Sequence, residues 1–430
     1  MKRVTASWLF LVVAVWGAAF TAVSYRPPRR PGWLMVVSFF AAWLTTELAA
    51  LHLAWQLAAT VLFVAAGALD AWPGWVGLAV TTISWIALFA STATARRTSQ
   101  VFHTAFDDAL GPQWAAAFDP AWAPSPYRLE WRRVVLPFRF RRRGVERIRN
   151  VSYVEGSTSR RHRLDIYRRA DAPPDAPVLL QIHGGAWMIG NKDQQGLPLM
   201  YHLAARGWVC VAINYRLSPR ATWPDHLVDC KRALAWVRQH IADYGGDPGY
   251  VVVTGGSAGG HLTAMMGLTA NDPTFQPGFE QVDTTLQAMV PCYGVFDWTN
   301  RFGFRHPWSD LNVVLERYIV KQRLDDAREI YDMASPLSHV HRDAPPALVV
   351  HGTLDRLAPV EEARAFVDAL RAASAEPVVY VELPGAHHAF EVFQSIRSMH
   401  TVAAVDLFLT WLLTTHPPRR VPDRDVRATS

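Results

Sequence analysis

The stretch that most constrains the fold is GGSAGG at residues 255–260, because it places a turn of small residues between an expected strand and an expected helix. The β-branched run 251–254 precedes it, and the helix-like run 261–268 follows it. Strand, tight turn and helix are the setting of a G-x-S-x-G elbow, which presents a serine hydroxyl at the edge of a sheet. The motif alone is weak, so the role of Ser257 depends on the rest of the chain.

Apolar runs alternate with amphipathic stretches throughout the C-terminal two thirds of the chain. This alternation predicts an α/β fold with a mostly parallel sheet covered by helices on both faces. The expected strands are 164–167, 177–182, 208–214, 251–254, 286–292, 347–351 and 378–383. The expected helices are 194–206, 224–244, 261–268, 360–372 and 395–414.

A carboxylate and an imidazole follow the serine in the order that an acyl-transfer triad requires. A serine hydroxyl needs an imidazole base, and the base needs a carboxylate that fixes its tautomer. Asp355 follows the strand 347–351, and His388 follows the strand 378–383. Because sites form in the loops at the carboxyl ends of such strands, we expect Ser257, Asp355 and His388 to converge. His387 is the competing base.

Acyl transfer also needs N–H donors aimed at the developing oxyanion. The turn HGGAW at 183–187 follows an expected strand, and its glycines allow close approach of the backbone to a substrate carbonyl. We expect the donors to be Gly185, Ala186 and Ala258. The residues expected to shape the turns are Gly184, Gly255 and Gly259.

The N-terminal third is apolar and predicts a bundle of three or four transmembrane helices over residues 1–97. The runs 5–25, 33–69 and 75–93 are each long enough to cross a bilayer. The second run is too long for one ordinary span, so it is either one tilted helix or two segments bent near Glu47. Glu47 and His52 are expected at this bend or at a helix interface. Further apolar runs oppose the reading of 5–25 as a cleaved signal peptide.

Positive residues favour a multi-pass membrane protein with its C-terminal domain on the cytoplasmic face. With three spans, the arginines of the loop 26–32 share a side with Arg96 and Arg97, whereas Lys2 and Arg3 lie opposite. With four spans, the C-terminal domain lies on the opposite face of the membrane from the loop 26–32. The net charge of +6 accompanies apolar helices rather than a basic, aromatic-interleaved domain, which argues for a membrane surface and against nucleic acid.

The remaining boundaries follow from composition. Residues 98–145 are expected to form a basic juxtamembrane linker, in which the arginine-rich stretch 128–143 either attracts anionic lipids or is a solvated basic face. The hydrolytic domain is expected at 146–416, with a cap insertion near 296–338, and residues 417–430 as a disordered tail. The aromatic residues that either line an acyl pocket beneath the cap or simply pack are Phe296, Trp298, Phe302, Phe304 and Trp308.

Four stretches together resemble the hormone-sensitive-lipase-like branch of the α/β-hydrolases: HGGAW at 183–187, YRLSP at 215–219, the elbow, and the helix region 223–248. With the apolar N-terminal segments, the chain is similar to membrane-anchored Lip-type carboxylesterases of mycobacteria. The resemblance covers about 151–415 and implies an α/β-hydrolase fold and hydrolysis of lipid-like or short-to-medium acyl esters, with no metal or organic cofactor. It also favours His388 over His387, because the family places x-Phe after the base.

Two residues depart from the family pattern. Ala186 stands where a third glycine is common, and Gly256 stands where an aspartate usually precedes the serine. The second departure weakens any transfer of substrate from the family. Other functions compatible with the residues are a deacetylase, peptidase or acyltransferase with the same triad, a non-catalytic membrane-tethered interaction module, or a small transporter. The three cysteines are widely spaced and predict buried thiols rather than disulfides or a zinc site.

Overall fold

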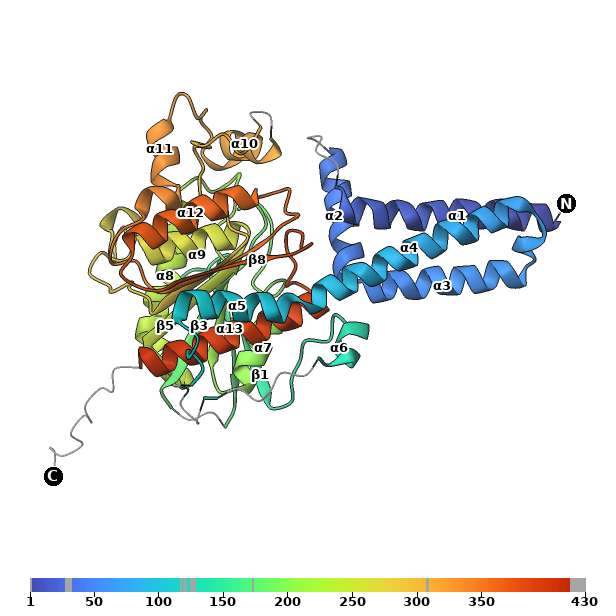
Figure 1. The fold of residues 1–430 in the computed structure, drawn as a ribbon. Coiled ribbons are helices and arrows are strands. Elements are labelled where there is room, and N and C mark those ends of the chain that lie inside the picture. The colour runs from blue at the N-terminus through green and yellow to red at the C-terminus, as the bar shows by residue number, and fades with distance from the viewer. Residues whose placement is uncertain are drawn as a thin grey trace.

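The computed structural model describes residues 2–27, 33–116, 118, 122–123, 129–171, 174–306 and 309–417. The predictions made for Arg29 and Arg30, for Trp308 and for the tail after residue 417 concern residues outside these ranges. Figure 1 shows two regions: a slender helical bundle that carries the N-terminus, and a larger domain built around a sheet.

The sheet has eight strands in the order β1-β2-β4-β3-β5-β6-β7-β8. Strand β2 is antiparallel to both β1 and β4, and the strands from β4 to β8 are parallel, so the prediction of a mostly parallel sheet is confirmed. The strands are β1 (Val145–Ser152), β2 (Arg163–Arg169), β3 (Ala176–Ile182), β4 (Val209–Ile213), β5 (Gly246–Gly256), β6 (Ala288–Cys292), β7 (Ala347–Gly352) and β8 (Val378–Leu383). Strand β1 was not expected, because its sequence VERIRNVS is mostly polar and it lies at a sheet edge.

Helices cover both faces of the sheet (Figure 1). One core lies under α8 (Asp225–His240), α9 (Ala258–Leu268) and α12 (Val360–Ala373). The other lies under α5 (Thr98–Leu110), α7 (Leu197–Ala205) and α13 (Ile396–Thr415). The short helices are α6 (Trp131–Val135), α10 (Asp310–Val314) and α11 (Arg328–Met333).

Helix α5 differs from the expected linker at 98–145. Phe102 and Phe106 of this helix are 1% and 0% exposed and belong to the same core as Trp208 and Phe408. The apolar face of α5 therefore packs into the core of the sheet domain, and Trp114, just beyond the helix, belongs to the same core. The short pattern Val-Phe-x-x-x-Phe was too brief to indicate this packing from sequence.

The bundle consists of α1 (Lys2–Tyr25), α3 (Ala49–Ala65) and α4 (Trp72–Arg96), which lie side by side in Figure 1. Helix α2 (Trp33–Glu47) crosses the end of the bundle that meets the sheet domain, and it is bent by 89° from α3. Of the two alternatives for the run 33–69, the structure thus has two segments with a bend next to Glu47. Buried polar groups join the bundle, since the hydroxyls of Thr21 and Ser84 lie 2.8 Å apart.

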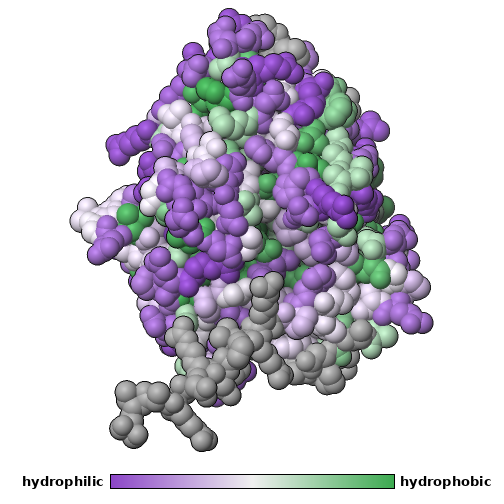
Figure 2. Space-filling model, turned by 90° about the vertical axis from the view of Figure 1, so that its left-hand side faces the viewer, coloured by the Kyte–Doolittle hydropathy of each residue, from purple (hydrophilic) through white to green (hydrophobic). Residues whose placement is uncertain are grey.

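Exposed apolar side chains are concentrated on these N-terminal helices. Among the described residues, most large hydrophobic side chains that are exposed precede residue 90. Helices long and apolar enough to cross a membrane are Val4–Tyr25, Trp72–Leu110 and Ile396–Thr415, together with the bent pair that ends at Ala65. The third, α13, is largely buried within the domain. By contrast, the face of the domain that lies away from the bundle is predominantly hydrophilic (Figure 2).

Candidate active site

The serine elbow joins β5 to α9. Ser257 has φ 60° and ψ −123°, a strained conformation for a residue with a side chain, and its N–H donates to the carbonyl of Cys292 at 3.0 Å. The turn demands glycine on both sides of it. A Cβ on Gly255 or Gly259 would lie 2.5 or 2.2 Å from the carbonyl oxygen of Ile182, which is backbone and has little room to yield.

The structure brings Asp355 and His388 together at the carboxyl ends of β7 and β8. His388 Nδ1 lies 2.7 Å from Asp355 Oδ2, while the N–H groups of Leu357 and Ala358 donate to Oδ1 at 2.9 and 3.0 Å. Burial alone would raise the pKa of Asp355, but the neighbouring charge of His388 and hydrogen bonds from His351 and His388 outweigh it and hold this pKa well below its usual range. Asp355 is therefore a carboxylate that orients the imidazole and leaves Nε2 directed elsewhere.

The other histidine of the pair has a different partner. His387 Nε2 lies 2.7 Å from the carbonyl oxygen of Ser24, at the end of α1. Burial lowers the pKa of His387, which favours its neutral form. The geometry therefore pairs Asp355 with His388 and gives His387 a contact with the bundle.

Tyr293 connects the elbow to the imidazole and was not foreseen from sequence. Its ring lies 4.6 Å from the ring of His388 at an angle of 61°, and the residue is 1% exposed. A Cβ on Gly256 would lie 2.1 Å from the Tyr293 hydroxyl oxygen. The absence of a side chain at 256 is thus explained: the volume that an aspartate would take is filled by Tyr293. The hydroxyl of Ser257 makes no hydrogen bond to another described residue.

The turn after β3 runs beside the elbow. A Cβ on Gly184 would lie 2.6 Å from the carbonyl oxygen of Gly256. Gly185 has a positive φ of 113°, and a Cβ on this residue would lie 2.2 Å from the carbonyl oxygen of Ile189. Among the described residues, no turn, loop or side-chain acceptor takes a hydrogen bond from the N–H groups of Gly185, Ala186 and Ala258. These three donors are available to a ligand, and the Ala258 N–H also opens helix α9.

Two of the four described cap aromatics pack in the core instead of lining a pocket. Phe296 stacks on Phe366 with ring centroids 4.3 Å apart, and Trp298 stacks on His261 at 4.7 Å. Phe302 and Phe304 are exposed and stack on each other. Ordinary packing, the simpler of the two interpretations given above, therefore accounts for Phe296 and Trp298.

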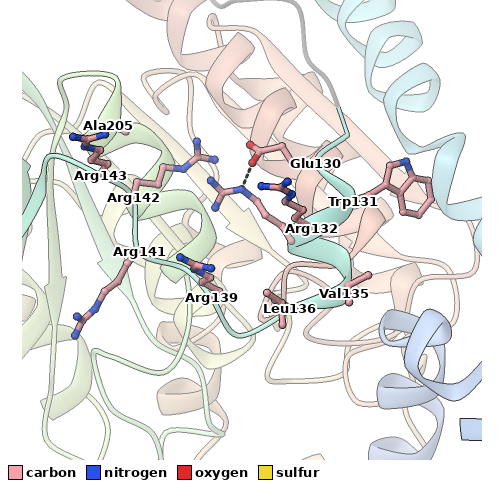
Figure 3. A pocket seen from close by; sticks show the side chains of 11 residues that line it. Glu130, Trp131, Arg132, Val135, Leu136, Arg139, Arg141, Arg142, Arg143 and Ala205 are labelled. Atoms are coloured by element: carbon pink, nitrogen blue, oxygen red, sulfur yellow. Dashed lines mark hydrogen bonds and ion pairs between the residues drawn. The ribbon is translucent and has the colours of Figure 1, made fainter. Parts of the chain in front are cut away.

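A cavity of about 750 Å³, separate from the Asp355–His388 pair, lies at helix α6 and the loop that follows it. Its wall combines arginine side chains with an apolar edge, and Glu130 pairs with one of these arginines, Arg133, at 2.6 Å (Figure 3). The lining residues are Glu130, Trp131, Arg132, Arg133, Val135, Leu136, Arg139, Arg141, Arg142, Arg143 and Ala205. Arg96, at the end of α4, lies over the Trp131 ring at 5.2 Å, so this cavity adjoins the base of the bundle.

The sheet order, the strained serine elbow and the Asp–His pair on the loops after β7 and β8 define an α/β-hydrolase. The BD-FAE family matches residues 164–370. The chain is 45% identical over 415 residues to "Probable carboxylic ester hydrolase LipM" of Mycobacterium tuberculosis, covering 94% of this chain and 93% of the relative. It is also 45% identical over 332 residues to esterase LipQ of the same organism, covering 75% and 77% of the two chains. The protein therefore belongs to the carboxylic ester hydrolase family of these two mycobacterial relatives, and the expected resemblance to Lip-type enzymes is confirmed.

A solved structure supports the same class. Thermogutta terrifontis esterase 2 phosphonylated by sarin is 25% identical, with a TM-score of 0.53, over 64% of this chain and 97% of that one. A propionate-bound form of the same organism's Est2 is 26% identical with a TM-score of 0.51, over 64% and 96%. Each of these two matches covers less than two thirds of this chain.

Proposed function

We propose that the protein is a membrane-anchored serine ester hydrolase in which Ser257 is the nucleophile, His388 the base and Asp355 the residue that orients it. His388 Nε2 takes the hydroxyl proton as Ser257 attacks the ester carbonyl. The N–H groups of Gly185, Ala186 and Ala258 receive the oxyanion. His388 then protonates the departing alcohol, and the acyl-enzyme is hydrolysed by a water that His388 deprotonates.

One observation carries this proposal: the hydrogen-bonded Asp355–His388 pair lies against Tyr293, which itself lies against the serine elbow. The buried ring of Tyr293 thus contacts the proposed base and lies next to Gly256, the residue before the proposed nucleophile, which supports a shared site. Catalytic hydrogen bonds are often long in the free enzyme, so we expect the bond between the Ser257 hydroxyl and His388 Nε2 to form when substrate binds.

A phosphonate probe tests the catalytic assignment. The Thermogutta esterase is phosphonylated by sarin, so a fluorophosphonate is a suitable reagent for a relative of the same fold. We expect the full-length protein to be labelled and the Ser257→Ala variant to remain unlabelled. Ser338→Ala, which changes an exposed serine, serves as the control and should be labelled like the wild type. Labelling of Ser257→Ala at the wild-type rate would contradict the assignment of the nucleophile.

We infer that helices α1, α3 and α4 cross the bilayer. At 1.5 Å per residue, the 24 residues of α1 span about 36 Å and the 17 residues of α3 about 25 Å, close to the ~30 Å of a hydrocarbon core. With three spans, Arg26, Arg96 and Arg97 share the face of the catalytic domain, which favours the cytoplasmic side. Protease treatment of sealed inside-out and right-side-out vesicles distinguishes the two orientations, since only the exposed domain is digested.

The substrates we propose are carboxylic esters with lipid-like or short-to-medium acyl groups. The propionate-bound Est2 structure supports a site that admits short acyl groups in this fold. The apolar bundle supports esters that partition into a bilayer. A series of p-nitrophenyl esters of increasing acyl length, assayed in detergent and in vesicles, measures the preference directly.

We propose further that the arginine-lined cavity at α6 binds the head group of an anionic lipid. Six arginines line it, and the apolar side chains of Trp131, Val135 and Leu136 are exposed at its edge, which suits a charged head group with acyl chains. Replacing Arg139, Arg142 and Arg143 together by glutamine is expected to reduce retention of labelled phosphatidylglycerol through detergent washing, with phosphatidylcholine unaffected. A matched variant removes the exposed arginines of the cap region, Arg323 and Arg328, and should retain the lipid. Equal retention by both variants would contradict this binding site.

A further inference from the structure

Helix α2 of the membrane bundle lies directly against the loop that carries the catalytic histidine. The indole N–H of Trp43 donates to the carbonyl oxygen of Ala389, next to His388, at 2.8 Å. The ring of Phe39, one turn earlier on the same helix, lies 6.1 Å from the His388 ring at an interplanar angle of 74°. These contacts join residues that are almost 350 positions apart in the chain.

Aromatic packing fixes the orientation of this part of α2. Trp43 stacks on Phe39 with centroids 5.6 Å apart and nearly parallel planes, and it also stacks on Phe393 with centroids 4.7 Å apart. Trp43 is 9% exposed, whereas the neighbouring ring of Phe40 is 49% exposed. The helix therefore turns Phe39 toward the site and Phe40 away from it.

A buried ion pair holds the far end of α2 in place. Glu47 pairs with Arg397 at the start of α13, and it accepts a hydrogen bond from the Ser395 hydroxyl at 2.6 Å. Glu47 and Arg397 are 5% and 1% exposed. The contact of His387 with the carbonyl of Ser24 adds a link from α1 to the same loop. Five contacts of α2 and one of α1 with the segment 387–397 thus make α2 a fixed wall rather than a loosely tethered anchor.

The chemistry of the histidine indicates which part of a substrate this wall meets. The base that protonates the departing alcohol must approach the alkoxy oxygen of the ester, so groups beside His388 border the alcohol moiety rather than the acyl chain. Phe39 is an apolar ring beside the imidazole, on a helix that lies at the end of the membrane bundle. An apolar surface here stabilises an alkyl or acylglycerol-like alcohol and offers nothing to a polar sugar.

We propose that α2 completes the active site and that Phe39 is a specificity-determining residue for the alcohol part of the ester, selecting apolar alcohols that approach from the bilayer side. This inference rests on the proposed serine hydrolase mechanism. It assigns to the membrane region a role in substrate selection in addition to anchoring.

The test measures kcat/KM of the full-length protein in vesicles for butyrate esters of ethanol, butanol and octanol, by proton release. Phe39→Ala is expected to lower the preference for octyl over ethyl butyrate by about 10-fold, because removal of the Phe39 ring eliminates contacts that only the longer alcohol makes. Phe39→Trp, which narrows the same space, is expected to shift the preference toward ethyl butyrate by obstructing the octyl chain. Phe40→Ala is the matched control, with an unchanged preference.

Fluorophosphonate labelling of Ser257 separates the possible failures. If Phe39→Ala is labelled at the wild-type rate and retains the wild-type alcohol preference, α2 is not part of the alcohol site and the inference is overturned. If the wild type itself shows no Ser257-dependent labelling, the proposed hydrolase mechanism fails instead. A loss of labelling in Phe39→Ala is resolved by Phe39→Leu, which keeps an apolar side chain, should restore labelling, and should show an intermediate octyl preference. An unaltered octyl preference in the labelled Phe39→Leu variant also overturns the inference.

Discussion

Substituting Gly256 by alanine is the sharpest test of how the elbow and the base are coupled. The new Cβ would lie 2.1 Å from the Tyr293 hydroxyl oxygen and 2.5 Å from the ring carbon that bears it. Because non-bonded heavy atoms rest at about 3.5 Å, the tyrosine ring must move by roughly 1 Å. The backbone of Gly256 has no positive φ that would itself penalise alanine, so the steric contact is the main cost.

The displaced ring has little free space. Tyr293 lies between the ring of His388 at 4.6 Å and the ring of Phe390 at 5.2 Å, and it is fully buried. Overpacking of this kind costs about 1–3 kcal/mol of stability. A shift of His388 by a similar ~1 Å is expected to lower kcat about 100-fold, since misplacement of a catalytic group on that scale has this effect.

Two measurements separate these consequences. Chemical unfolding of Gly256→Ala gives the loss of stability, and ester hydrolysis with active-site titration gives the loss of kcat. Gly249→Ala is the control, because Gly249 is an exposed residue of β5 and its Cβ would meet only the Asp247 side chain, with the shortest contact at 3.1 Å. It should change neither quantity by much.

A double-mutant cycle with Tyr293→Leu tests the cause. The smaller side chain vacates the space that the new Cβ needs, so Gly256→Ala should cost markedly less stability in the Tyr293→Leu background. Equal costs in both backgrounds, or wild-type activity of Gly256→Ala, would refute the reasoning that Tyr293 dictates the glycine.

Three further outcomes are expected. Asp355→Asn should lower kcat by about 10⁴-fold through loss of the correct imidazole tautomer. Because folding depresses the pKa of Asp355, its contribution to stability is present above its unfolded pKa of about 3.9 and is lost as the pH falls further. The free energy of unfolding of the variant, measured from pH 5 to pH 2, should therefore fall less steeply than that of the wild type. Glu47→Gln leaves Arg397 buried without its partner and should destabilise the full-length protein by about 3–5 kcal/mol in thermal melts; an unchanged melting temperature would mean that the pair is not buried in solution. His387→Ala should keep Ser257-dependent probe labelling, whereas His388→Ala should abolish it; the reverse pattern would exchange their roles.

Much of the catalytic domain could be predicted from local patterns. The strand before Ser257, the helix after it and the loops that carry Asp355 and His388 are each encoded within a few residues, by β-branched runs and the breakers that end them. Their convergence follows from the rule that parallel strands place their carboxyl ends at one edge. The choice between His387 and His388 came from resemblance and not from spacing, and only the contact with Asp355 distinguishes them physically.

The features that escaped prediction depend on contacts between distant segments. Nothing around Tyr293 in the sequence marks it as the neighbour of His388, although the unusual Gly256 was a signal that a bulky side chain takes the space of the customary aspartate. Phe39 and Trp43 read as ordinary residues of an apolar helix, because hydropathy does not report which face meets a partner. Glu47 was noticed for its charge, but its partner Arg397 lies 350 residues away.

The passage from α4 into α5 has a consequence for how the enzyme encounters its substrate. The two helices follow one another with a single intervening residue, and α5 is embedded in the core beside β8 and α13. In the membrane-spanning arrangement, such a rod sets the height and tilt of the catalytic centre above the lipid plane instead of letting the domain swing on a tether. The turnover rate would then depend on the mole fraction of ester within the leaflet, which is a two-dimensional concentration. Diluting the ester with inert lipid, while its bulk concentration is kept constant, should therefore slow the reaction.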